Sequence, residues 1–308
     1  MALTFNGTDG FRDTGTGALG LPSGTTAQRP SSPANGYMRY NTDLAIVEAY
    51  VNGSWSSYNL GTYTVEYLLI GGGGGGNYGG GGAGGLIYST SQAVQGGTSY
   101  AVIIGAGGAG LNAGGSSSFI GATAVGGGSQ SNGGSGGGSG TASNGVYGTR
   151  YSGTAGQGNS GGRGLYYDNG SSWFSGNGGG GGAGAVGGDQ PFTFDVSAGA
   201  GGNGLAYTIT GSSVTYAGGG GGAGGNRASP GSGGSGGGGA GANGPGANGT
   251  TNLGGGGGGG STSQNQGSGG SGVLILRYLG SQRGTGGIVT SAGGYTIHTF
   301  NSSGNYIA

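Results

Sequence analysis

The glycine run at residues 71–76 constrains this chain more than any other feature. It directly follows the apolar segment Tyr67-Leu68-Leu69-Ile70 and leads, after Asn77-Tyr78, into further glycine-rich sequence. Similar alternation of short β-like and glycine-dense segments continues to about residue 278. Glycine loses more backbone freedom on folding than alanine, by roughly 0.5–1 kcal/mol per residue. Because 98 of the 308 residues are glycine, an ordered structure must offset this cost with many close interactions.

Two kinds of structure are open to such a composition. Low-complexity glycine-rich chains are often flexible linkers. The alternative is an ordered lattice, which is not collagen because six prolines are too few. Polyglycine II fits better: this left-handed helix has three residues per turn and no internal hydrogen bonds, so neighbouring rods must satisfy its backbone groups. Glycine allows close approach on all sides, and surface rods can carry Ala, Ser or Asn at outward positions.

The regular spacing of the β-like segments favours the lattice over the linker. We predict a mostly β and irregular fold with essentially no α-helix. Residues 62–70 and 273–278 are expected to be two central strands of one sheet, which closes the body by pairing its two ends. Further strands are predicted at residues 86–90, 100–104, 117–120, 205–210 and 214–216, with roughly ten glycine rods between the strands.

The predicted organisation has three parts. Residues 1–61 form a small N-terminal β meander, residues 62–278 form the glycine-rich polyglycine II and β body, and residues 279–308 form a C-terminal β-hairpin packed on that body. In the meander, Asn52-Gly53 is a strong hairpin signal, and the aromatic side chains are expected to form the core. In the C-terminal part, Gly293-Gly294 is predicted to be the turn.

Charge and cysteine content exclude several functions. Acidic and basic residues are equal in number, and there is no lysine and no cysteine. This balance does not indicate a nucleic-acid groove or a basic membrane patch, and the lack of cysteine excludes disulfides and thiolate metal sites. The N-terminal sequence has no basic region followed by a long apolar run, so we expect neither a cleaved signal nor a membrane helix.

Catalytic motifs are also missing. A nucleotide-binding Walker A loop needs lysine, and the many Gly-x-Gly-x-x-Gly matches arise from composition alone. The single histidine, His298, is expected to be a strand residue without a chemical role. The acids that could serve glycan cleavage, Glu66, Asp168, Asp189 and Asp195, are few enough to occur in turns by chance. We therefore predict no enzyme activity, no catalytic residue, no metal and no cofactor.

Three interruptions of the glycine, at residues 146–151, 165–174 and 189–195, carry large side chains. A glycine lattice has little room for them, so we expect them in loops at rod ends, where binding residues concentrate on a rigid scaffold. The alternative is that these aromatics form a satellite core under a long loop. The predicted receptor-binding residues are Tyr147, Arg150, Tyr151, Tyr166, Tyr167, Asp168, Asn169, Trp173, Phe174, Gln190 and Phe192. Residues 227–230 and 261–266 are weaker loop candidates.

The N-terminal sequence resembles a short module of bacteriophage tail-fibre proteins. The resemblance covers residues 21–58 and rests on Pro22-Ser23-Gly24-Thr25-Thr26-Ala27-Gln28-Arg29-Pro30, on Tyr37-Met38-Arg39-Tyr40-Asn41-Thr42, and on Glu48 and Trp55. In such fibres the module is a structural or trimerising connector. The body resembles the glycine-rich domains at phage tail-fibre tips, and residues 279–308 resemble the C-terminal tail of many glycine-rich fibre proteins. At fold level the body is also similar to the glycine-rich ectodomain of the anaplastic lymphoma kinase receptor family, although that version carries cysteines.

The resemblance implies a non-enzymatic receptor-binding adhesin at the distal end of a viral tail fibre, in the virion, made in the host cytoplasm. Tail-fibre adhesins of T-even-type phages pack polyglycine II rods into a slab whose end loops meet the host receptor, and we carry over only that architecture. The implied partners are a host polysaccharide or outer-membrane protein, and other fibre or baseplate proteins that bind through the N-terminal module. We expect a homotrimer, and we expect no binding to nucleic acid. A purely structural fibre shaft or virion decoration protein, or a polysaccharide depolymerase, are the alternatives.

Overall fold

The computed structural model describes residues 20–44, 46–57, 61–193, 196–261 and 266–308. The chain divides into two compact units, Met1–Leu60 and Gly61–Ala308. In the described residues the only helical element is one 3-10 turn, η1 (Thr26–Gln28), and the rest is strand or irregular. The prediction of a mostly β fold is confirmed. None of the helices in these ranges is long and apolar enough to cross a membrane.

The N-terminal unit is a four-stranded sheet in the order β1 (Ser23–Gly24), β2 (Met38–Asn41), β3 (Ile46–Val51) and β4 (Ser54–Ser57). β1 runs parallel to β2, and the other neighbours are antiparallel. Asn52 and Gly53 both have positive φ, which is the backbone that an Asn-Gly hairpin turn requires. The predicted meander strands and turn are therefore present.

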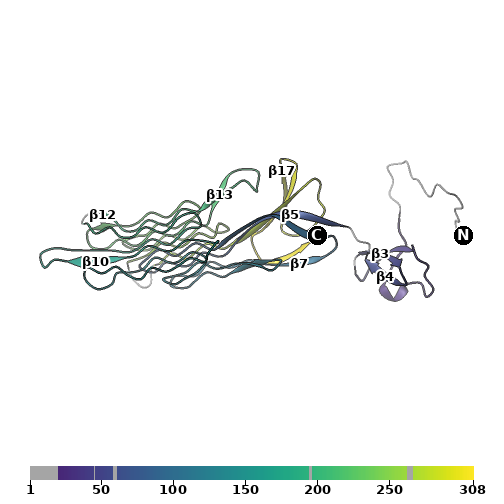
Figure 1. Cartoon of the computed structure of the whole chain (residues 1–308), viewed down its shortest axis with the longest axis horizontal. Helices are drawn as coiled ribbons and strands as arrows, with labels where there is room; N and C mark the ends of the chain where they lie inside the picture. Colours follow the sequence, from purple (N-terminus) through teal and green to yellow (C-terminus); the bar gives the residue numbers. More distant parts are fainter. Residues whose placement is uncertain (1–19, 45, 58–60, 194–195, 262–265) are drawn as a thin grey trace. The chain divides into compact units, whose positions relative to one another are not determined.

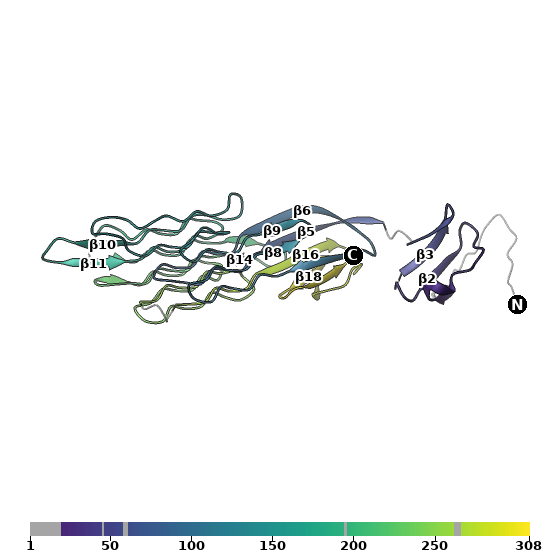
Figure 2. The same ribbon diagram turned by 90° about the horizontal axis from the view of Figure 1, so that it is seen from below.

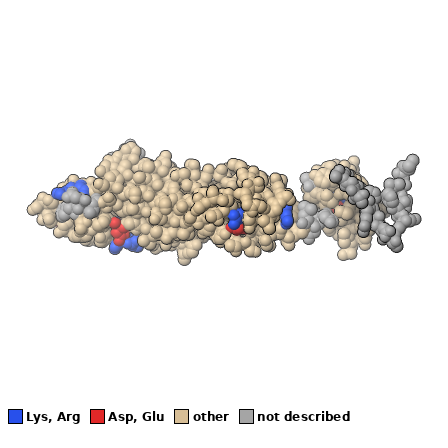
Figure 3. All heavy atoms as spheres, turned by 90° about the horizontal axis from the view of Figure 1, so that it is seen from above, with Lys and Arg blue, Asp and Glu red and all other residues tan. Residues whose placement is uncertain are grey.

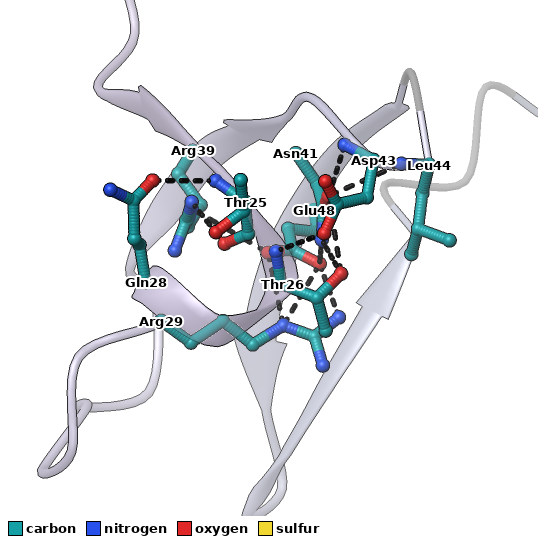
Figure 4. Close-up of polar contacts among 9 residues, drawn as sticks. All are labelled: Thr25, Thr26, Gln28, Arg29, Arg39, Asn41, Asp43, Leu44 and Glu48. Carbon is teal, nitrogen blue, oxygen red and sulfur yellow. Dashed lines mark hydrogen bonds and ion pairs between the residues drawn. The ribbon is translucent and has the colours of Figure 1, made fainter.

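A buried carboxylate, rather than an aromatic core, lies at the centre of this unit (Figure 4). Glu48 on β3 is 1% exposed. Arg29 donates to Glu48 through Nε at 3.1 Å and Nη2 at 2.5 Å, and Asn41 Nδ2 donates at 3.1 Å. On β2 the inward positions are Arg39 and Asn41, so Met38 and Tyr40 face outward and are exposed. The expectation of an aromatic core was wrong for β2 because the polar side chains take its inner face to pair with Glu48.

The glycine-rich unit contains two larger sheets. The first has the order β17 (Ile288–Ala292), β18 (Tyr295–Phe300), β16 (Val273–Leu279), β5 (Thr62–Ile70) and β6 (Leu86–Gln95), all antiparallel. The second has the order β19 (Gly304–Ile307), β7 (Ser99–Ile103), β8 (Ser117–Phe119) and β9 (Ala122–Ala124). β5 and β16 pair at the centre of the first sheet, as predicted, with Leu276 opposite Tyr67.

The C-terminal hairpin turns at Gly293-Gly294, as expected, with positive φ at both residues. Its second strand, β18, pairs directly with β16, so the hairpin extends the main sheet.

Both faces of the central strands are buried. Because side chains alternate along a strand, Tyr67, Leu69 and Leu276 pack on one side with Phe119 and Tyr306. Leu68, Ile70 and Ile275 pack on the other side with Ile209 and Tyr216. This double burial explains the nearly continuous apolar run that precedes the first glycine run.

The rod at residues 71–76 is fully buried and donates to three neighbouring rods in rotation. Each third N–H returns to the same neighbour, at 2.8 to 3.0 Å: Gly71 and Gly74 bond to Gly85 and Gly82, Gly72 and Gly75 to Gly115 and Asn112, and Gly73 and Gly76 to Gly270 and Gly267. Its carbonyls accept hydrogen bonds from three further rods. The Gly72 carbonyl accepts from Gly127, and the Gly73 and Gly76 carbonyls accept from Gly108 and Leu111. The carbonyls of Gly74 and of Asn77, which follows the run, accept from Gly257 and Gly260. A repeat of three residues is what polyglycine II requires, so this rod has six hydrogen-bonded neighbours.

Outer rods show the same repeat in their burial. In residues 105–110, 199–204 and 231–235, every third position is exposed and carries a side chain: Ala106, Ala109, Ala200, Asn203, Ser232 and Ser235. The glycines between them are buried or half-buried. The prediction that Ala, Ser and Asn occupy outward positions of surface rods is confirmed.

Within the glycine-rich unit, the rods lie side by side and connect the two sheets to a set of loops (Figure 1). Two further strands, β10 (Leu165–Asp168) and β11 (Trp173–Gly176), lie at the end of this unit opposite β5 and β16 (Figure 2). We call that end of the glycine-rich unit the distal end.

Candidate functional site

β10 and β11 form an antiparallel hairpin at the distal end, which we call the distal hairpin. Tyr167 lies opposite Phe174, and Asp168 opposite Trp173. In the turn, Asn169 Oδ1 accepts from the N–H groups of Ser171 and Ser172 at 3.0 and 2.9 Å. These residues were predicted to be a loop. Instead they form two paired strands joined by a turn at Gly170, which has positive φ, and their large side chains alternate between the two faces of the hairpin.

The inner face of the distal hairpin is a small aromatic cluster. The Tyr167 ring lies 5.8 Å from Phe174 and 4.7 Å from Phe192 between centroids, and the two phenylalanines are 6.2 Å apart. Phe174 is buried, whereas Phe192 is exposed. For these three residues the alternative of a satellite core describes the geometry better than a free loop does.

The outer face combines two aromatic rings with a carboxylate. Tyr166 and Trp173 have ring centroids 6.1 Å apart, and Tyr166 Oη donates to Asp168 Oδ2 at 3.3 Å. Trp173 is 46% exposed although it is one of the largest apolar side chains. Partial desolvation, and then the neighbouring Asp168, raise the pKa of Tyr166 above its ordinary value.

Two asparagines that sequence reasoning did not select hold the edges of the hairpin. Asn144 donates to the Asp168 carbonyl and accepts from the Asp168 N–H, both at 2.7 Å. On the other edge, Asn226 Nδ2 donates to the Trp173 carbonyl at 2.9 Å. The backbone beside each asparagine also pairs with the hairpin, because the Gly145 N–H donates to the Tyr166 carbonyl at 2.9 Å and the Ser175 N–H donates to the Asn226 carbonyl at 3.1 Å. No sequence signal distinguishes these two asparagines from others in the glycine-rich segments.

Two of the predicted residues, Arg150 and Tyr147, lie in an ion cluster with Asp189 and Arg163. Asp189 accepts from Arg150 Nη2 at 2.7 Å on both oxygens, and from Arg163 Nη2 and Nε at 2.7 and 3.1 Å. The Arg163 guanidinium lies 4.3 Å from the Tyr147 ring centroid. Burial alone would raise the pKa of Asp189, but the hydrogen bonds from Arg163 and the charges of both arginines lower it overall. Arg150 and Tyr147 therefore have structural partners here.

The remaining predicted residues lie elsewhere. Gln190 is fully buried, and its side chain fills the space beside Gly176, so it does not form part of the surface. Phe174 is buried as well, and both residues are corrections to the expectation of direct receptor contact. Tyr151 is half-buried, and its carbonyl accepts from the Gly161 N–H at 2.9 Å. Asn169 and Phe192 are exposed beside the distal hairpin's aromatic faces.

A comparison with known protein families finds one family model that matches the glycine-rich part of the chain. A family model described as a glycine-rich domain matches residues 50–279, which is most of the chain. The chain belongs to this glycine-rich domain family. No curated protein and no solved structure matches the chain.

In this glycine-rich domain, charged groups are sparse. The face in Figure 3 shows them at a few separate places. Glu66 on β5 pairs with Arg277 on β16, far along the chain from Asp168 and Asp189, and Asp195 lies outside the described residues. Over the described ranges there is no cluster of three metal-ligating side chains. His298 is a buried β18 residue whose Nδ1 lies 2.8 Å from the Gly286 carbonyl, and burial lowers its pKa.

Proposed function

We propose that this protein is a phage tail-fibre adhesin that binds a host cell-surface receptor without catalysis. The observation that carries the proposal is the outer face of the distal hairpin. There Tyr166 and the exposed Trp173 lie together at the end of a hydrogen-bonded rod bundle. Exposed aromatic side chains on a rigid support are typical of recognition surfaces, because tyrosine and tryptophan contribute much contact area at low entropic cost.

A surface glycan fits this face better than a protein loop does. The rings of Tyr166 and Trp173 can cover the apolar face of a sugar, and the Asp168 carboxylate and Asn169 amide beside them can bond its hydroxyls. Asn144, Asn226 and the Arg150–Asp189–Arg163 cluster would keep this surface in place. In this proposal the N-terminal unit joins the fibre, and several copies in a homotrimeric fibre raise a modest affinity by avidity.

The test is cell binding by purified, labelled protein on a panel of bacterial strains. We expect the double variant Tyr166→Ala/Trp173→Ala to lose at least about tenfold in binding, because aromatic residues at the centre of an interface carry much of its energy. Its melting temperature should stay close to that of the native protein, since the outer face is not part of the core.

Leu279→Ala is the matched control, because Leu279 is 67% exposed at the end of β16 and lies away from the distal hairpin. It should bind like the native protein. Removal of the surface polysaccharide from the cells should abolish binding if the receptor is a glycan. Equal binding by the double variant and the native protein would refute the assignment of the hairpin, and a native protein that binds no strain would favour a purely structural fibre protein.

A further inference from the structure

A pocket of about 470 Å³ lies on the flank of the glycine-rich unit. Its lining includes Leu86 and Tyr88 of β6, Tyr207 of β13 (Leu205–Tyr207), and the turn at residues 156–159. β13 lies near the junction of the rods and the sheets, whereas β10 lies at the distal end (Figure 1). The pocket is therefore separate from the distal hairpin, and its volume is in the range of small-ligand sites.

One ionic bridge fixes both tyrosines of the pocket. The Tyr88 hydroxyl donates to Glu66 Oε1 at 2.5 Å, and Arg277 binds the same carboxylate through Nε and Nη2 at 2.8 and 3.0 Å. Arg277 Nη1 also donates to the carbonyl of Thr208, the residue after Tyr207, at 3.1 Å. The Tyr88 and Tyr207 rings then lie 4.8 Å apart between centroids. The hydrogen bond to Glu66, followed by burial, raises the pKa of Tyr88 to about 12, so its ring stays neutral.

The pocket combines ring faces with unused hydrogen-bonding groups. Within the described ranges, the Tyr207 hydroxyl and the Gly156 carbonyl take part in no hydrogen bond. By contrast, the side chain of Gln157 is occupied by the backbone of Val125 and Thr123. None of the lining residues carries a charge. A wholly apolar ligand would leave these polar groups without partners, and an ionic ligand would lose its hydration without gaining a counter-charge.

We propose that this pocket binds a neutral saccharide ring. The apolar face of the sugar would lie against Tyr207 and Tyr88, and its hydroxyls would bond the Tyr207 hydroxyl and the turn at residues 156–159. The pocket depends on no residue of the distal hairpin, so this site is independent of the proposed receptor-binding surface.

The experiment is ligand-observed NMR of the full chain with glucose, galactose, mannose and N-acetylglucosamine, followed by calorimetry on whichever sugar gives a signal. At least one of the four sugars should bind the native protein. Tyr207→Ala should weaken binding at least about tenfold, because it removes a ring face. Tyr207→Phe keeps the ring and should weaken binding by less than that. Should Tyr207→Ala not fold, Tyr207→Leu, which also lacks the ring, provides a second variant with the same expected direction.

The Tyr166→Ala/Trp173→Ala variant separates this site from the distal hairpin, because it should bind the free sugar as the native protein does. Absence of binding by all four sugars to the native protein would overturn the proposal. So would undiminished binding by the folded Tyr207→Ala or Tyr207→Leu variant, or loss of binding in the distal variant.

Discussion

Gly80→Ala is expected to lower the free energy of unfolding of the glycine-rich unit by more than about 3 kcal/mol, the upper range for an overpacked core. A Cβ at Gly80 would lie 1.9 Å from the carbonyl oxygen of Gly220. That oxygen accepts from the Gly180 N–H at 2.8 Å, and Gly80 itself donates to Gly178 at 3.0 Å. One methyl group therefore disturbs three rods, and backbone atoms cannot move aside as a flexible side chain can.

Gly244→Ala is the matched control for the rod variant. A Cβ at Gly244 would meet no atom within 4 Å, and its φ is not in the left-handed region. The free energy of unfolding of the control should lie within about 0.5 kcal/mol of the native value. It could be slightly higher, because alanine restricts the conformations of the unfolded chain. Denaturant titration followed by circular dichroism measures both variants. Equal stability of Gly80→Ala and Gly244→Ala would show that the buried rods tolerate side chains, contrary to the lattice.

Glu48→Ala is expected to lower the free energy of unfolding of the N-terminal unit by about 3 kcal/mol. This is the low end of the range for removing one partner of a buried ion pair. The change would leave Arg39, which is 5% exposed, without the carboxylate that lies 3.6 Å from its Nε. Small units of this size have little stability in reserve. Fluorescence of Trp55 in a Trp173→Phe background should report the loss, since Trp55 packs on Tyr50 in the same sheet.

Glu48 should also make the stability of the N-terminal unit depend on pH in the acidic range. The hydrogen bond from Arg29, with weaker help from Asn41 and the charges of both arginines, lowers the pKa of Glu48 from its ordinary value of 4.5 despite burial. A carboxylate whose pKa is lower in the folded state stabilises the fold fully at pH values above its unfolded pKa. That stabilisation is lost as the pH falls through the lowered pKa of the folded state. Glu48→Gln should therefore flatten the loss of stability below about pH 4.5.

Asp43→Asn is the control carboxylate for Glu48. Asp43 is exposed and accepts from the Thr26 N–H at 2.8 Å, which an asparagine can also do. Its replacement should cost less than about 1 kcal/mol. If Glu48→Ala unfolds at the same denaturant concentration as Asp43→Asn, the buried carboxylate is not the centre of this unit.

The sequence predicted the scaffold well because glycine constrains it so strongly. Apolar runs before and after the glycine body predicted the β5–β16 pair, and the spacing of Ala106 and Ala109 between glycines matches their outward positions. The neighbours of each rod could not be predicted, because all rods offer the same backbone groups. Their order depends on turns and on side chains such as Asn226, which bonds a strand 53 residues away.

The candidate site was predicted less completely. The aromatic segment at residues 165–174 was recognised, but its strands were not, because the surrounding glycine, serine and asparagine indicated a loop. Sequence reasoning also could not separate the exposed Trp173 from the buried Phe174 without the pairing of β10 and β11. Arg150 was predicted to contact the receptor because the sequence does not show that it pairs with Asp189, which lies 39 residues away.

Amide hydrogen exchange over residues 71–76 and 105–110 tests the lattice most directly. The six amides of residues 71–76 all donate to neighbouring rods, whereas in residues 105–110 Gly108 donates to Gly73 and Ala106 and Ala109 donate to no described residue. We predict slow exchange throughout residues 71–76, and fast exchange at Ala106 and Ala109 beside a slow Gly108. Uniformly fast exchange across both segments would contradict the rod bundle and favour a flexible glycine-rich chain.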